Sequence, residues 1–169
     1  MQTKKLLKNT DLNAASKLQI YKSIIRLIVT YGCETWAMTV TKQNHLLIFE
    51  RRVLRKIFGP TQDDDGTWRI KTNKELEILI EKKTIVRFIK SQRLHWVAHV
   101  IRMDTKRTVK KLTEWEPCSS RPVGRSRPRW LEQVEEDLKM REVRNWREKC
   151  KDRGLWNEII KQAKTHQGL

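Results

Sequence analysis

The sequence has no apolar run long enough to cross a membrane, and it contains few cysteines. A membrane-spanning helix needs about 20 consecutive apolar residues, and no stretch of the chain approaches that length. No apolar segment of the kind found in secretory signals follows Met1, so we expect a protein that is not exported. The 3 cysteines are odd in number and far apart, which favours free thiols in the nucleus or cytoplasm over a disulfide framework.

Acidic residues are scarce relative to basic ones. The chain has 37 Lys and Arg against 20 Asp and Glu, a formal net charge of +17. A surplus of this size attracts polyanions, and the sequence pI of about 10.2 is typical of nucleic-acid-binding domains. We therefore expect RNA, DNA or an RNA–DNA duplex as the partner, and no membrane. Solubility is the simpler interpretation of the same charge.

What the sequence does contain is apolar residues at helical spacing. They predict helices over residues 13–31, 41–58, 73–80 and 84–103, and further helices after residue 129. Asn13, Thr41, Asn73 and Asn145 are the expected N-caps, and Gly32 is an expected helix end. The apolar faces are expected to include Ile24, Ile28, Leu79, Trp96, Trp130 and Trp156. The expected fold class is all-α, with six or seven helices in two small packs.

The expected division of the chain follows the breaks in this pattern. Residues 1–103 are predicted to form one helical domain, residues 104–128 a basic linker rich in Pro and Gly, and residues 129–169 a C-terminal helical unit. Asp65-Gly66 is a turn signal, so a short β-hairpin is predicted near residues 60–71.

Two basic clusters are the candidate contacts with phosphate. Arg125, Arg127 and Arg129 lie where prolines keep the chain extended, and Arg can engage phosphate through a bidentate fork. A solvated linker or a nuclear-import signal is the alternative. The second cluster lies on predicted helices, where a solvated face is the alternative; it consists of Arg51, Arg52, Arg55, Lys56 and Arg93.

Trp68 is the candidate platform for base stacking, because it lies in a polar loop beside Arg69. The other tryptophans at helical spacing are assigned to packing.

No arrangement of residues predicts catalysis, a metal site or a cofactor. Residues 63–65 are three consecutive Asp in a turn between glycines, which favours a solvated loop over a two-metal centre. His95 and His99 stand four apart but lack the intervening Glu or a nearby pair of cysteines that a zinc site would use. We therefore expect no enzymatic activity of this chain by itself.

Five motifs along the chain occur in the same order as in a known family. They are YGCETW at 31–36, FERRVLRKIFGP at 49–60, QRLHW at 92–96 with HVIRM at 99–103, GRSRPRW at 124–130, and NWREK at 145–149 followed by Asp152-Arg153. Together they resemble the C-terminal portion of endonuclease–reverse transcriptases from non-LTR retrotransposons of the LINE or jockey type. The resemblance covers about residues 12–165.

The resemblance implies a role in RNA-directed DNA synthesis. Residues 13–103 would be the thumb and its helical continuation, which grips the template–primer duplex, and residues 121–165 the distal tail. The catalytic palm, with its aromatic–Ala–Asp–Asp turn, would lie N-terminal to this region in the parent polyprotein and would be its partner. Ser126 stands where the family has a proline, which affects the conformation of that loop but not its charge.

Overall fold

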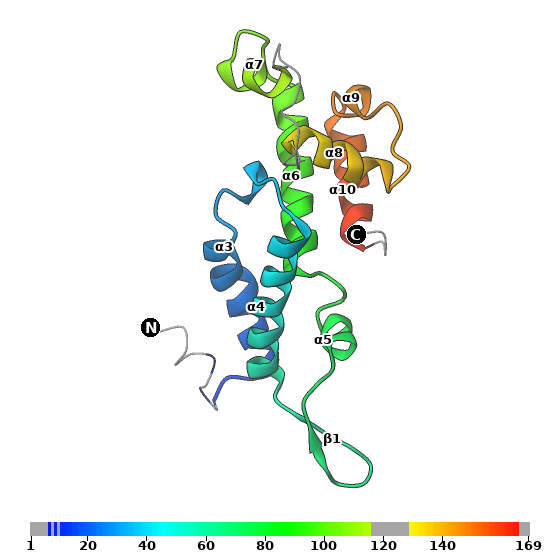
Figure 1. The fold of residues 1–169 in the computed structure, drawn as a ribbon. Helices are drawn as coiled ribbons and strands as arrows, with labels where there is room; N and C mark the ends of the chain where they lie inside the picture. The colour runs from blue at the N-terminus through cyan, green and yellow to red at the C-terminus, as the bar shows by residue number, and fades with distance from the viewer. Residues whose placement is uncertain (1–6, 8, 10, 116–128, 166–169) are drawn as a thin grey trace, which may run out of the picture. The chain divides into compact units, whose positions relative to one another are not determined.

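The protein is described by a computed structural model over residues 7, 9, 11–115 and 129–165. It divides into two compact units (Figure 1). Unit 1 consists of the chain up to Tyr31 and of residues 40–86, and unit 2 of residues 32–39 and of the chain from Arg87 onward. This division differs from the predicted domains, because most of the helix at residues 85–101 packs with the C-terminal helices.

Unit 1 contains a continuous helix made of α2 (Ala14–Ile20), a π-helical turn (Tyr21–Ile25) and α3 (Arg26–Val29). Asn13 is its N-cap as predicted, and its side-chain oxygen accepts from the Ser16 N–H at 2.7 Å. Gly32, at φ +66°, follows the helix in the left-handed conformation that was expected there. Ile24 and Ile28 are exposed, contrary to the prediction, because the wider π-turn shifts which residues face inward.

Helix α4 (Val40–Phe58) packs beside α2 in unit 1 (Figure 1). It begins one residue before Thr41, so Thr41 is inside the helix and is not its N-cap. It ends before Gly59, which has φ +66°. The core of unit 1 joins α2, the π-turn, α4 and α5, and consists of Leu7, Tyr21, Leu54, Ile57, Leu76 and Ile80.

A short antiparallel hairpin and a short helix complete unit 1. Strands β1 (Thr61–Gln62) and β2 (Trp68–Arg69) pair as the turn signal predicted, with Gln62 opposite Trp68. Helix α5 (Asn73–Leu79) is capped by Thr72, not by Asn73. Leu79 is exposed, so the inward face of α5 is narrower than its sequence indicated.

The buried carboxylate of Glu50 connects three elements of unit 1. It accepts from the Tyr21 hydroxyl at 2.8 Å and from the backbone N–H of Ile85 at 2.9 and 3.0 Å. Ile85 is the first residue of α6 (Ile85–Ile101), so the carboxylate lies at a helix N-terminus, where negative charge is favoured. Burial raises the pKa of Glu50 above its ordinary value, and these hydrogen bonds oppose that shift.

Unit 2 is built around α6. Its other helices are the 3-10 turn η2 (Cys33–Thr35), α7 (Thr108–Glu114), α8 (Trp130–Lys139), α9 (Trp146–Lys149) and α10 (Arg153–Thr165). Helix α7 lies within residues 104–128, where the sequence predicts a basic linker without a helix. Asn145 precedes α9 as expected, but its side chain makes no capping hydrogen bond.

The core of unit 2 joins α6, α8 and α10. It includes Leu94, Val97, Val134, Leu138, Trp156 and Ile160. The indole N–H of Trp156 donates to the Leu94 carbonyl at 3.0 Å, and that of Trp130 donates to the Glu34 carbonyl at 2.7 Å. The Gln133 side chain binds the backbone of Met38 at 2.6 and 2.9 Å. These bonds explain why residues 32–39 belong to unit 2.

The all-α prediction is confirmed, together with its one short hairpin. In the part of the chain that the structure describes, none of the helices is both long and apolar enough to span a bilayer.

Candidate nucleic-acid interface

Helix α4 carries an exposed basic surface that no acidic side chain on the same helix neutralises. Its single carboxylate, Glu50, points into the core and is buried. Its cations are Lys42, Arg51, Arg52, Arg55 and Lys56. The helix therefore carries a clear excess of positive charge.

Two of the four predicted cations on α4 are held by neighbouring elements of unit 1. The guanidinium of Arg51 pairs with Glu77 at 3.2 Å. That of Arg55 donates to the Lys71 carbonyl at 3.2 Å and to the Asn73 side chain at 2.8 Å. Both side chains are half-buried. They fix α4 against the segment around α5, and this role limits their freedom to turn toward a ligand.

Arg52 and Lys56 differ from those two residues. Both are exposed, and neither makes a hydrogen bond or ion pair with any residue in the described ranges. They stand four positions apart, so their side chains are neighbours on one face of the helix. Two adjacent like charges without a counter-ion destabilise the free surface slightly, and a bound phosphate would remove that repulsion.

Arg93 lies in a different environment from the one predicted. Its side chain is 2% exposed inside unit 2, where it pairs with Asp137 and donates to Gln133 at 2.7 Å. Lys90 pairs with the same carboxylate at 3.1 Å. Because its guanidinium is enclosed, Arg93 is removed from the candidate contacts and is a structural residue.

The linker cluster is described in part. Arg125 and Arg127 lie outside the described residues. Arg129 is exposed immediately before α8, and its backbone N–H donates to the Glu132 carboxylate at 3.0 Å.

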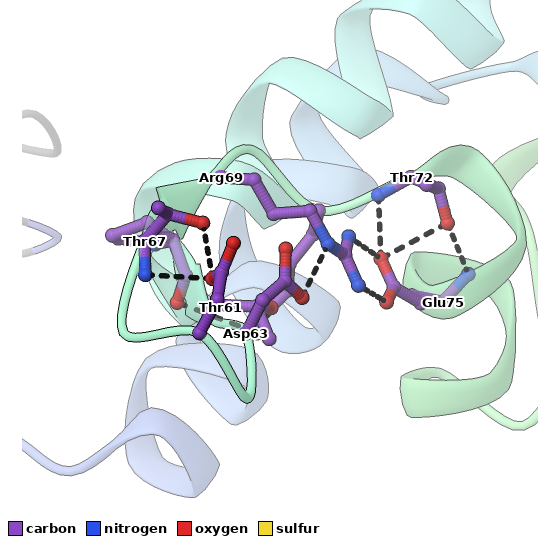
Figure 2. Close-up of polar contacts among 9 residues, drawn as sticks. Thr61, Asp63, Thr67, Arg69, Thr72 and Glu75 are labelled. Atoms are coloured by element: carbon purple, nitrogen blue, oxygen red, sulfur yellow. Dashed lines mark hydrogen bonds and ion pairs between the residues drawn. The ribbon is translucent and has the colours of Figure 1, made fainter.

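Trp68 is exposed, as the stacking hypothesis requires, with 67% of its surface accessible. The residue after it, Arg69, fixes the hairpin through a bridge of ion pairs (Figure 2). Its guanidinium binds Asp63 at 2.8 Å and Glu75 at 2.6 Å. Glu75 also accepts from the Thr72 backbone N–H at 2.6 Å and so closes the capping box of α5. Arg69 and Thr72 together hold the pKa of Glu75 at about 2.

Sequence reasoning missed this bridge, although one signal could have indicated it. Thr72-Asn-Lys-Glu75 matches the capping-box pattern of Thr followed three residues later by Glu. The pattern fixes the start of α5 and the position of the carboxylate that receives Arg69. The hairpin turn is acidic, and Asp65 accepts from the Thr67 hydroxyl and N–H at 2.6 and 2.9 Å. Any stacking on Trp68 would therefore occur beside negative charge.

The two histidines considered as metal ligands stand on α6. His99 is exposed, and its ring lies 5.5 Å from that of Trp96. Among the residues with described positions, no three His, Cys, Asp or Glu side chains gather as a metal site.

Comparison with known proteins gives a related sequence. No family model matches the chain, and no solved structure is detectably similar to it. A protein of Caenorhabditis elegans named as uncharacterised and transposon-derived is 25% identical over 156 residues, which cover 89% of this chain. The chain is similar to a transposon-derived protein. It spans 56% of that relative's length, and the similarity is consistent with an origin in a mobile element.

Proposed function

We propose that this chain is a nucleic-acid-binding C-terminal part of a retrotransposon reverse transcriptase, acting in the nucleus or cytoplasm. It grips a template–primer duplex through phosphate contacts and does not catalyse synthesis. Catalysis belongs to a polymerase palm elsewhere in the parent polyprotein, which is also its protein partner. The family motifs and the similarity to a transposon-derived protein support this origin.

One observation carries the binding proposal. Arg52 and Lys56 are exposed and unpaired within the described structure, on a helix whose only carboxylate is buried. A rigid helix that presents two neighbouring cations can follow a phosphate backbone without reading base sequence. An RNA-containing duplex suits this mode, because its deep, narrow major groove hides the base edges and proteins recognise its shape and backbone.

The salt dependence of duplex binding tests the role of this pair. Each phosphate contact that is lost lowers the magnitude of the log–log salt slope by about 0.9 on a duplex. We expect the magnitude of the slope to be about 1.8 smaller for the double variant Arg52→Gln/Lys56→Gln than for the wild type. Fluorescence anisotropy with an end-labelled duplex measures the slope. Unrelated duplex sequences should show the same loss, because phosphate contacts carry no sequence information.

The matched control is Lys83→Gln/Lys151→Gln, which changes the charge equally. Lys83 pairs with Glu81, and Lys151 pairs with Glu148 at 2.9 Å, so neither ammonium lacks a counter-charge. The control should retain the wild-type slope. An equal reduction of the slope in both double variants would show that the overall charge matters and that α4 is not the contact surface. An unchanged slope in Arg52→Gln/Lys56→Gln would also exclude α4 as the contact surface.

A protein-interaction module is the second candidate function, in an active element or in a remnant. The observation that favours it is an exposed apolar stripe along the first helix of unit 1, at helical spacing. It consists of Ile24, Leu27 and Ile28 on the helix and of Tyr31 in the turn that follows it. If the chain binds no nucleic acid and a soluble variant with Leu27→Ser and Ile28→Ser loses a protein partner, this second function replaces the first.

A further inference from the structure

Unit 2 contains a groove that the proposed duplex contacts do not use. Its volume is about 800 Å³, and residues of η2, α6, α7, α8 and α9 line it. Pockets that hold ligands have volumes of about 300–1,000 Å³. All lining residues belong to unit 2, so the groove is complete within one compact unit.

Three tryptophans contribute to the wall of the groove. They are Trp96 from α6, Trp115 directly after α7 and Trp130 from α8. The indole N–H of Trp130 donates to the Glu34 carbonyl at 2.7 Å, which fixes the position of this ring. Trp115 is 65% exposed, and Leu112 of α7 is 68% exposed. The face of an aromatic ring attracts cations, and that of Trp does so most strongly. The wall therefore offers both apolar contact and an aromatic face to a cation.

Acidic side chains outnumber basic ones in the lining of the groove. The lining contains three carboxylates and two guanidiniums, those of Glu114, Glu132, Glu135, Arg129 and Arg147. Arg147 is already engaged, because its guanidinium lies 3.8 Å from the Glu135 carboxylate and 5.2 Å from the centre of the Trp146 ring. The groove is therefore negative on balance, in a chain whose net charge is +17.

Glu114 is the carboxylate of the groove that is most available to a ligand. It is the exposed last residue of α7, next to Trp115, and it makes no hydrogen bond or ion pair with any residue in the described ranges. Glu132 differs, because its carboxylate accepts from the Arg129 backbone N–H at 3.0 Å. A cation bound beside Glu114 and Trp115 would gain both an ion pair and an aromatic face.

We propose that this groove binds a basic, apolar peptide segment of a partner protein. A Lys or Arg side chain of the segment lies against Trp115 and pairs with Glu114, and its apolar side chains contact Leu112 and Val109, which are both exposed. An anionic occupant would instead meet a surplus of carboxylates. Salt screens charges over about 8 Å under physiological conditions, so the local charge of the groove outweighs the distant cations of the chain. This binding is independent of the duplex contacts assigned to unit 1.

The test measures the binding of two short peptides to the full chain by fluorescence anisotropy at one fixed salt concentration. One probe has the sequence GLRLRG, with blocked ends and a dye of no net charge. The second, GLQLQG, replaces each Arg by Gln and is otherwise identical. The wild type should bind the Arg peptide more tightly than the Gln peptide. Attraction by the overall charge cannot produce this preference, because the chain and the Arg peptide are both positive.

Substitutions of two exposed residues separate the contributions. Trp115→Leu keeps an apolar side chain but removes the aromatic face. It should weaken binding of the Arg peptide roughly twofold to thirtyfold, the range for one cation–π contact, and leave the Gln peptide unaffected. Trp115→Phe should recover part of the loss, because Phe attracts cations less strongly than Trp. Glu114→Gln should likewise weaken binding of the Arg peptide alone.

The matched controls are Trp68→Leu and Glu136→Gln. Trp68 is 67% exposed and belongs to unit 1, and Glu136 is exposed on α8 outside the groove. Both variants should bind the Arg peptide as the wild type does, and an equal loss in them would overturn the inference. Equal binding of the two peptides by the wild type would also overturn it, as would an unchanged affinity of Trp115→Leu for the Arg peptide. If Trp115→Leu instead loses affinity for labelled dT12 alone, the groove holds unpaired nucleic acid and the inference is wrong.

Discussion

Arg93 and Asp137 form an ion pair inside unit 2, where their side chains are only 2% and 4% exposed. The pair joins α6 to α8 across 44 residues of sequence. Lys90 lies 3.1 Å from the second oxygen of the same carboxylate, so one buried anion serves two buried cations. Such a cluster is costly to desolvate, and removing its single anion is the most damaging change.

We therefore expect Asp137→Ala to destabilise unit 2 by about 3–5 kcal/mol, because it leaves two buried cations without a counter-charge. Arg93→Met should cost less, because Lys90 still pairs with Asp137 and the Met side chain fills the space of the Arg stem. Urea unfolding followed by tryptophan fluorescence measures this, since 6 of the 7 tryptophans lie in unit 2. Equal effects of the two substitutions would contradict this account of the cluster.

The raised pKa of Glu50 predicts a pH dependence of unit 1. The carboxyl group ionises more readily in the unfolded chain, so the stability it contributes is lost as pH rises from its ordinary pKa of 4.5 through the raised value. Glu50→Gln keeps an acceptor but cannot ionise. The stability of this variant relative to wild type should increase as the pH rises above 4.5. Hydrogen exchange of peptides from α4 measures the stability of both proteins. A relative stability that is constant or decreases with pH would refute the assignment.

Cys150 should resist alkylation in the native protein. Its side chain is fully buried, and burial raises the pKa of the thiol to about 12, so almost no thiolate exists near neutral pH. Cys33 is also buried. In a Cys118→Ser variant at pH 8, we expect iodoacetamide to modify neither cysteine until denaturant is added, as followed by mass spectrometry. Rapid native modification of Cys150 would show that unit 2 opens far more often than its packing indicates.

The linker arginines should contribute affinity without specificity. We expect the triple variant Arg125→Ala/Arg127→Ala/Arg129→Ala to weaken binding by a similar factor for duplexes of unrelated sequence. Anisotropy titrations of three such duplexes at one salt concentration measure this. A loss confined to one sequence would indicate contacts to base edges in place of phosphates.

The sequence predicts most of the helices because the residues that start and end a helix act on the neighbouring backbone. Asn13 and Gly32 each act through neighbouring backbone, and both are found where their residue types indicated. Arg93 could not be predicted in the same way. Helical spacing places it off the apolar face of α6, and its burial depends on Asp137 from a distant helix.

The candidate site also combines features that local sequence predicts with features that depend on tertiary contacts. Helical spacing places Arg52 and Arg55 on the same helix, but only the tertiary structure shows that Arg55 is bound to Lys71 and Asn73 while Arg52 is not.

The salt dependence of duplex binding by the wild-type chain tests the central claim most directly. If about six phosphates are neutralised by cationic side chains, a plot of log affinity against log salt concentration has a slope of about −5. The account predicts tight binding in dilute buffer that weakens along this line for any duplex sequence. Absence of binding in dilute buffer, or a slope near zero, would contradict it.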